Sequence, residues 1–140
     1  MDFLDTNVLV YRFDGDTPGK QHIARLAYGA AVRAGTALIS TQVMQEFYAT
    51  LSGKFARQVS RDIVLRAVRM LADLPVVQLT PELVLAAIAK HQRYSLSFWD
   101  ALIVQAAIAG GARRILSENL QHGLVVDGVR IENPFLEDKP

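Results

Sequence analysis

The stretch TALISTQVMQEFYATLSG, residues 36–53, changes from one periodicity to another part of the way along. Residues 36–40 form a short apolar run with the length and composition of a buried strand. Beyond them the apolar side chains recur every three or four positions, as on one face of a helix, and Gly53 ends the pattern. Ser40 or Thr41, at the junction, is a residue type that caps helix N-termini. The stretch therefore predicts a strand that leads directly into an amphipathic helix.

The same unit recurs on both sides of this stretch, which predicts the fold class. Because strands alternate with helices throughout, we expect an α/β fold with a mostly parallel sheet and helices on both faces. Near the end, VVDGVRIENP (125–134) leaves two alternatives open for residues 124–131, a hairpin around Asp127–Gly128 or a single last strand. The other expected strands are 2–4, 75–79 and 113–117, and the other expected helices are 18–33, about 61–71, 80–92 and 97–109.

Composition narrows the chemistry that the chain can carry. Its 140 residues suffice for one domain, which we place at 1–135, followed by a frayed charged tail at 136–140. Fifteen Lys and Arg against fourteen Asp and Glu give a net charge of +1, which neither indicates nor excludes a nucleic-acid partner. The chain has no cysteine, so a metal would need oxygen or imidazole ligands, which favours hard ions such as Mg²⁺ or Mn²⁺.

The sequence also predicts a location. MDFLDTNVLVYRFDGD, at the start, carries acids where a secretory signal would carry basic residues, so we expect a cytoplasmic protein. The longest apolar stretch, around 101–112, is broken by Gln105 and two glycines and is shorter than the roughly 20 residues of a membrane span. We therefore expect no membrane partner.

Carboxylates fall at or just beyond the expected carboxyl ends of the strands, where ligands bind in such sheets. Taken one at a time, each acid has a structural explanation that needs no shared site. Asp5 could cap a helix, Glu46 could be a solvated residue at the core boundary, and Asp100 could form a capping box with Ser97. Gathered in one cleft, they would repel one another by about 4 kcal/mol per close pair at an effective dielectric of 20, unless a divalent cation bound them. Such a cation would suit phosphodiester hydrolysis. These positions are Asp5, Glu46, Asp100, and Glu118 with its neighbour Asn119.

Four segments, in this order and spacing, resemble the PIN-domain nucleases, particularly the toxin subunits of VapBC toxin–antitoxin pairs: FLDTNVLVY (3–11), STQVMQEFYATL (40–51), LSFWDALIVQAA (96–107) and ILSENLQHG (115–123). The resemblance implies a three-layer fold with about five parallel strands. It also implies a Mg²⁺- or Mn²⁺-dependent endoribonuclease that acts on RNA, forms a homodimer and is blocked by a cognate antitoxin protein. Its catalytic and metal-binding acids would match Asp5, Glu46 and Asp100, and Thr6 and Asn7 would support them through hydrogen bonds.

One position departs from the family pattern. Many members carry a fourth acid where the segment Ser117–Glu118–Asn119 places Asn119, and a neutral amide supplies no charge. We therefore expect one tightly held metal, with a second bound weakly or only alongside substrate phosphate. Glu118 could rotate into the site and restore the charge. The same departure supports an alternative, a catalytically impaired PIN-like module that binds RNA or a protein. A phosphatase of the haloacid-dehalogenase type is disfavoured, because DTN lacks the second acid that this class uses.

The remaining candidates are basic, aromatic and imidazole side chains. Lys54 and Arg57 could contact RNA or a partner protein, although cationic stretches are more often solvated helix faces. Phe98 and Trp99 could stack on a base, but we expect them to pack in the core beside Asp100. The three histidines are scattered without metal-ligand spacing, so we expect none of them to bind a metal.

Overall fold

A single sheet runs through the middle of this computed structural model, which describes residues 1–136. The predicted tail at 136–140 thus lies, apart from Leu136, outside the described residues. The strands are β1 (Asp2–Leu4), β2 (Ala37–Ser40), β3 (Val76–Val77), β4 (Arg114–Leu116), β5 (Val125–Val126) and β6 (Val129–Glu132). The helices are α1 (Thr6–Tyr11), α2 (Pro18–Ala34), α3 (Thr41–Ser52), α4 (Arg61–Ala72), α5 (Pro81–Arg93) and α6 (Phe98–Ala109).

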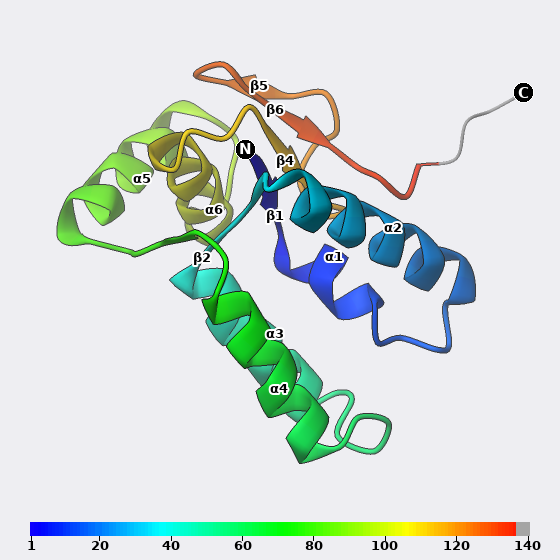
Figure 1. Cartoon of the computed structure of the whole chain (residues 1–140). Coiled ribbons are helices and arrows are strands. Elements are labelled where there is room, and N and C mark those ends of the chain that lie inside the picture. Colours follow the sequence, from blue (N-terminus) through cyan, green and yellow to red (C-terminus); the bar gives the residue numbers. More distant parts are fainter. Residues whose placement is uncertain (137–140) are drawn as a thin grey trace, which may run out of the picture.

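The sheet has the strand order β3-β2-β1-β4-β6-β5, and all neighbours pair in parallel except β5 with β6. In the central strand, Phe3 pairs with Leu38 of β2 and Ile115 of β4, and all three are buried. Such strands are apolar on both faces because helices cover both sides. Figure 1 shows α1 and α2 on one side of the sheet and α5 and α6 on the other, which confirms the predicted three-layer α/β fold.

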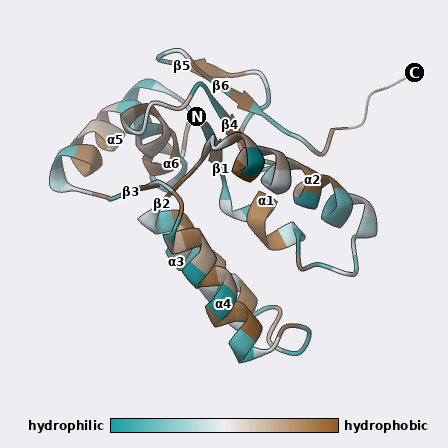
Figure 2. Ribbon diagram, in the orientation of Figure 1, coloured by the Kyte–Doolittle hydropathy of each residue, from teal (hydrophilic) through white to brown (hydrophobic). Residues whose placement is uncertain are grey.

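Four helices begin with a serine or threonine side-chain cap, including the one expected at residues 40–41. The side chains of Ser40, Ser60, Thr80 and Ser97 each accept a hydrogen bond from a backbone N–H in the first turn of α3, α4, α5 and α6. These bonds satisfy donors that the helix leaves free at its N-terminus. The α3–α4 pair extends away from the sheet, and Figure 2 shows hydrophobic and hydrophilic residues alternating around α4.

Residues 125–132 form both of the structures that the sequence left open, a hairpin and a last strand of the sheet. Asp127 and Gly128 both have positive φ, 48° and 84°, and make the two-residue turn of a β5–β6 hairpin. β6 also pairs in parallel with β4, so it is the last strand of the sheet as well. The sheet consequently has six strands, where about five were expected.

Three side chains that helical spacing places on the inner face lie outside instead. Leu26, Tyr48 and Ile63 are exposed, whereas Ala24 of α2 is fully buried. The spacing of apolar residues defines a stripe, but the partner elements decide which edge of that stripe is covered. None of the helices within residues 1–136 combines the length and apolar character needed to cross a membrane.

Candidate active site

The carboxyl end of the central strand opens into a pocket of about 510 Å³. Asp5 follows β1, Glu46 lies in α3, Asp100 lies in the first turn of α6 and Asn119 follows β4; all four line the pocket. They meet because β1, β2 and β4 are parallel neighbours whose carboxyl ends share one edge of the sheet. The structure thus brings the three predicted acids together, although their catalytic role stays a prediction.

Asp5 is the most deeply placed of these acids, with 7% of its surface exposed. Its Oδ1 accepts a hydrogen bond from Thr6 N at 2.8 Å, and its Oδ2 accepts one from the Ser117 hydroxyl at 2.8 Å. Burial raises the pKa of its carboxyl to about 6; those two hydrogen bonds oppose the increase, and the charges of Glu46 and Asp100 add to it. Asp5 therefore caps α1 and also bears charge in the pocket.

Glu46 is held at both carboxylate oxygens. The Thr6 hydroxyl donates to Oε1 at 2.8 Å, and Gln42 Nε2 donates to Oε2 at 3.3 Å. Gln42 precedes Glu46 by one helical turn, so both side chains lie on the same face of α3. Nε2 of Gln42 also donates to the backbone carbonyl of Trp99 at 3.2 Å. Gln42, which no sequence signal singled out, thereby links α3 to the first turn of α6.

Asp100 sits in a helix start that forms only half of the expected capping box. Its backbone N–H donates to Ser97 Oγ at 3.1 Å. The return bond, from Ser97 N–H to the Asp100 carboxylate, is absent from the hydrogen bonds of residues 1–136. Asp100 instead lines the pocket, close enough to Asp5 for its charge to raise the pKa of that carboxyl.

The loop after β4 separates the two candidates for the fourth acidic position. Asn119 lines the pocket, whereas Glu118 accepts hydrogen bonds from the Tyr11 hydroxyl at 2.6 Å and from Lys20 Nζ at 2.5 Å. Burial alone would raise the pKa of Glu118, but these two partners lower it below its usual value. Its backbone N–H also donates to Asn7 Oδ1, at 3.1 Å. The pocket is therefore left with an amide at its fourth position.

The pocket lining also includes residues that the sequence analysis placed in the core or did not consider. Trp99 is 64% exposed and lines the pocket, so the prediction that it packs in the core is wrong; a helix start at the rim leaves its ring outside. Phe98 does pack against the core. Lys54 lines the pocket and Arg57 does not. Asp14, buried in the loop after α1, is an additional acid in the pocket that carries no recognisable sequence motif.

The donor set suits a hard cation. Every carboxylate and amide that faces the pocket offers oxygen, and Asp5 is close enough to Glu46 and Asp100 for their charges to raise its pKa. As placed, no three His, Asp or Glu side chains among residues 1–136 stand close enough together to enclose an ion. Mg²⁺ is commonly held by only one or two carboxylates and keeps several waters. The residues therefore fit a hydrated magnesium or manganese ion.

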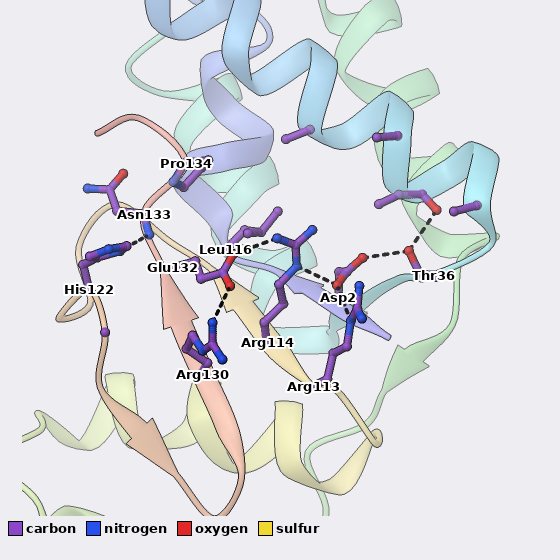
Figure 3. A pocket seen from close by; sticks show the side chains of 15 residues that line it. Asp2, Thr36, Arg113, Arg114, Leu116, His122, Arg130, Glu132, Asn133 and Pro134 are labelled. Atoms are coloured by element: carbon purple, nitrogen blue, oxygen red, sulfur yellow. Dashed lines mark hydrogen bonds and ion pairs between the residues drawn. The ribbon is translucent and has the colours of Figure 1, made fainter. Parts of the chain in front are cut away.

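A second pocket, of about 800 Å³, lies between α2 and the sheet. Figure 3 shows the side chains that line it. Its central group is Arg114, which donates to Asp2 Oδ1 at 2.8 Å and to Glu132 Oε2 at 2.7 Å. Arg113 and Arg130 lie 3.6 Å and 3.8 Å from the same two carboxylates. Because both acids are already paired, we interpret this cluster as a network that ties β1, β4 and β6 together.

Comparisons with known proteins concern the family and the fold. The model of the PIN domain matches residues 3–122. A toxin–antitoxin complex from Klebsiella pneumoniae has a similar structure, with a TM-score of 0.70 at 20% identity over 96% of this chain and 98% of that chain. VapC20 of Mycobacterium tuberculosis, a sarcin–ricin loop cleaving toxin, has a TM-score of 0.63 at 18% identity over 82% of this chain and 87% of that chain.

VapBC2 from Rickettsia felis, solved with a DNA fragment from its promoter, has a TM-score of 0.59 at 14% identity over 94% of this chain and 97% of that chain. A comparison with the curated proteins finds no match. At these identities the likeness to solved structures concerns the fold, and it extends over nearly the whole chain in two of the three cases.

Proposed function

The chain belongs to the PIN domain family, and on that basis we propose that it is a metal-dependent endoribonuclease, the toxin of a toxin–antitoxin pair. The observation that carries the proposal is the convergence of Asp5, Glu46 and Asp100, from three separate elements, in one pocket. Two similar structures support it further: one is a toxin–antitoxin complex, and another is a toxin that cleaves the sarcin–ricin loop.

In the proposed mechanism the carboxylates of Asp5 and Asp100 would hold a hydrated Mg²⁺ or Mn²⁺, and Glu46 would contribute its charge beside them. The bound ion would supply positive charge to phosphate oxygens and make a water molecule a better nucleophile. Ser117 and the N–H of Thr6 fix the orientation of Asp5, and the Thr6 hydroxyl and Gln42 fix that of Glu46.

The remaining polar groups of the pocket bind the substrate. Lys54 offers its ammonium group to the phosphate backbone at the pocket margin. Asn119 presents an amide at the fourth position without adding charge, which supports one tightly held ion. A metal titration of the free protein that finds two equally tight sites would contradict this arrangement.

The test is cleavage of cellular RNA by the purified chain with and without Mn²⁺. We expect Asp5→Asn and Asp100→Asn each to reduce cleavage at least about 100-fold, since each removes a charge that holds the ion. Asp62→Asn, which changes an exposed acid of α4 outside the pocket, is the matched control and should stay within about twofold. Cleavage that needs no metal and survives both pocket substitutions would overturn the mechanism.

The amide at position 119 favours a second candidate, a PIN-like module that binds RNA or a protein without cleaving RNA. RNA binding in the absence of cleavage under every metal condition would select this alternative. Substituting Lys54 should flatten the salt dependence of binding, whereas Arg57, which is outside the pocket, should matter less.

The proposed partners follow from the proposed toxin role. We propose a cytoplasmic homodimer that is blocked by an antitoxin, with a basic antitoxin side chain at the carboxylates. The mass of the purified chain in solution tests the dimer. Inhibition of cleavage by the co-expressed partner protein tests the antitoxin.

A further inference from the structure

We propose that Trp99 is a stacking platform for an unpaired nucleobase of the substrate, beside the carboxylates that would act on its phosphate. The inference rests on the proposed function, because it assumes that RNA enters this pocket. It goes further by assigning a binding site for the base, and it implies a preference for single-stranded or unstacked RNA over duplex.

The first observation is where the ring lies. Trp99 directly precedes Asp100 in the first turn of α6, and the two residues line the same pocket. With 64% of its surface exposed, Trp99 leaves a large aromatic group open to solvent. Tryptophan is usually well buried, so an exposed ring at the margin of a polar site is unusual for a purely structural role.

The second observation is that the exposed ring is supported on one side and that its backbone is fixed. The Trp99 carbonyl accepts a hydrogen bond from Gln42, the residue that also holds Glu46. The Trp99 ring packs edge-on against Phe98, with centroids 5.2 Å apart and planes at 66°, and Phe98 packs against the core. Gln42 thus fixes the backbone of Trp99 and Phe98 supports one edge of its ring, which reduces the conformational entropy that the indole loses when a base stacks on it.

The chemistry of the pocket favours a nucleotide over an apolar protein segment. Most of the residues that line it are polar or charged, including Asp5, Glu46, Asp100 and Lys54. The centres of protein interfaces are depleted of charged residues, whereas sites for single-stranded nucleic acid combine cationic groups, here Lys54 and the proposed ion, with aromatic rings. Every base has an aromatic face, so Trp99 would select unpaired bases rather than a particular sequence.

The chain offers a direct readout, because Trp99 is its one tryptophan. In the Asp5→Asn variant with Mg²⁺, where cleavage is expected to be strongly reduced and one acidic charge of the pocket is removed, a single-stranded RNA hexamer should quench the intrinsic tryptophan fluorescence. A hexamer of the same charge with abasic positions, and a blunt RNA duplex, should bind with little quenching. Equal quenching by the abasic hexamer would overturn the proposal.

Substitutions provide the second arm. Trp99→Leu should weaken binding of the single-stranded hexamer about 5- to 150-fold, the range measured for loss of one base–aromatic stack. Trp99→Phe should retain part of that affinity, because it keeps an aromatic face. Leu85→Ala, which changes a residue of α5 that is 67% exposed and lies outside the pocket, is the matched control. Unchanged hexamer affinity in Trp99→Leu would overturn the proposal.

The two arms separate this inference from the proposed function. Quenching and Trp99-dependent affinity without any cleavage would support the stacking site while the nuclease proposal fails. Metal-dependent cleavage with an unaffected Trp99→Leu variant would leave the nuclease proposal standing and overturn the stacking site. If Trp99→Leu alters the solution mass or antitoxin binding but not RNA affinity, Trp99 belongs to a protein interface and the proposal is wrong.

Discussion

Asp5 is both buried and ionisable, and without a metal its burial disfavours its charge. Hydrogen bonds from Thr6 and Ser117 fix the orientation of its carboxylate at the pocket. Burial nevertheless raises the pKa of this carboxyl to about 6. At neutral pH the Asp5 carboxylate is therefore ionised in the folded chain, but its ionisation costs more free energy there than in the unfolded chain. Such a conflict between charge and burial is typical of a functional group rather than a structural one.

At the residue scale we predict that Asp5→Asn stabilises the metal-free protein while it reduces cleavage. The folded pKa lies above the unfolded value of about 4, so the folded state binds more protons and loses stability as pH rises from about 4 to 6. Above that window the substitution should raise the free energy of unfolding by up to about 3 kcal/mol. Denaturant unfolding of both proteins in EDTA at several pH values measures this difference in the free energy of unfolding.

The shape of the pH dependence is the control for this prediction. At pH 4 the two proteins should be nearly equally stable, because Asp5 is then largely protonated in the folded state. A gain that is the same at pH 4 and pH 8 would show that packing, and not ionisation, distinguishes the variant.

Helix α6 sets the positions of both Asp100 and Trp99, and its two ends are defined differently. Ser97 caps its N-terminus by accepting a hydrogen bond from Asp100 N–H. At the other end Gly110 lies against the sheet, where an added Cβ would come within 2.6 Å of Leu38 Cδ2 and 2.8 Å of Val77 Cγ2. The absence of a side chain lets the helix pack directly on β2 and β3.

We predict that Gly110→Ala destabilises the fold by about 1–3 kcal/mol, as expected for overpacking of a filled core. Gly19→Ala in α2 is the matched control, because a Cβ there meets nothing within 4 Å. That control should be neutral or stabilising by about 0.5–1 kcal/mol, since alanine favours a helix. Equal melting temperatures for the two variants would contradict this account of the α6 terminus.

A second element-scale prediction concerns the link between β1, β4 and β6. Burial alone would raise the pKa of Asp2, but hydrogen bonds from Arg114 and Thr36 lower it below its usual value. We expect Arg114→Met to cost about 1.5–3 kcal/mol at neutral pH, the range for hydrogen bonds to charged groups. Arg130→Met, whose side chain is 66% exposed and 3.8 Å from Glu132, should cost under about 1 kcal/mol.

The pH dependence of the Arg114→Met effect has a defined sign. Because the folded pKa of Asp2 is depressed, its contribution is present above the unfolded pKa of about 4 and is lost as pH falls through the lower, folded value. The difference between wild type and Arg114→Met should therefore shrink in acid. Unfolding curves at pH 7 and pH 3 measure it, and a difference that grows in acid would contradict it.

On the scale of the whole molecule, the net charge of +1 conceals a strong local asymmetry. Acids that are 41 and 54 positions apart along the chain, at Asp5, Glu46 and Asp100, meet at one edge of the sheet. Their mutual repulsion opposes folding, and a divalent cation would relieve it. Metal binding and global stability should therefore be linked.

We predict that Mn²⁺ raises the melting temperature of the protein, and raises it more at pH 7.5 than at pH 5. Protons compete with the ion for the Asp5 carboxylate as pH falls below its pKa of about 6. An ion at 100 times its Kd would add about 2.7 kcal/mol to the free energy of unfolding. Asp5→Asn is the control and should respond little; an equal response in that variant would place the ion elsewhere.

Much of the fold and of the pocket follows from local sequence alone. Residues 36–53 predicted a strand, a cap and a helix correctly because periodicity and capping depend on near neighbours. The parallel topology followed from the alternation of elements, and it placed Asp5, Glu46 and Asp100 at one edge. Local sequence could not predict that Leu26 and Tyr48 face solvent, because the elements packed against a helix decide which side is covered.

The tertiary structure alone decided how neighbouring side chains divide between the pocket and its surroundings. Glu118 and Asn119 are adjacent in the sequence, but Lys20 and Tyr11, about 100 positions away, pair with Glu118 and leave Asn119 in the pocket. Trp99 is likewise exposed because α6 begins at the rim of the sheet. Residue chemistry and spacing are local properties, whereas the direction of a side chain is set by partners that only the folded chain brings near.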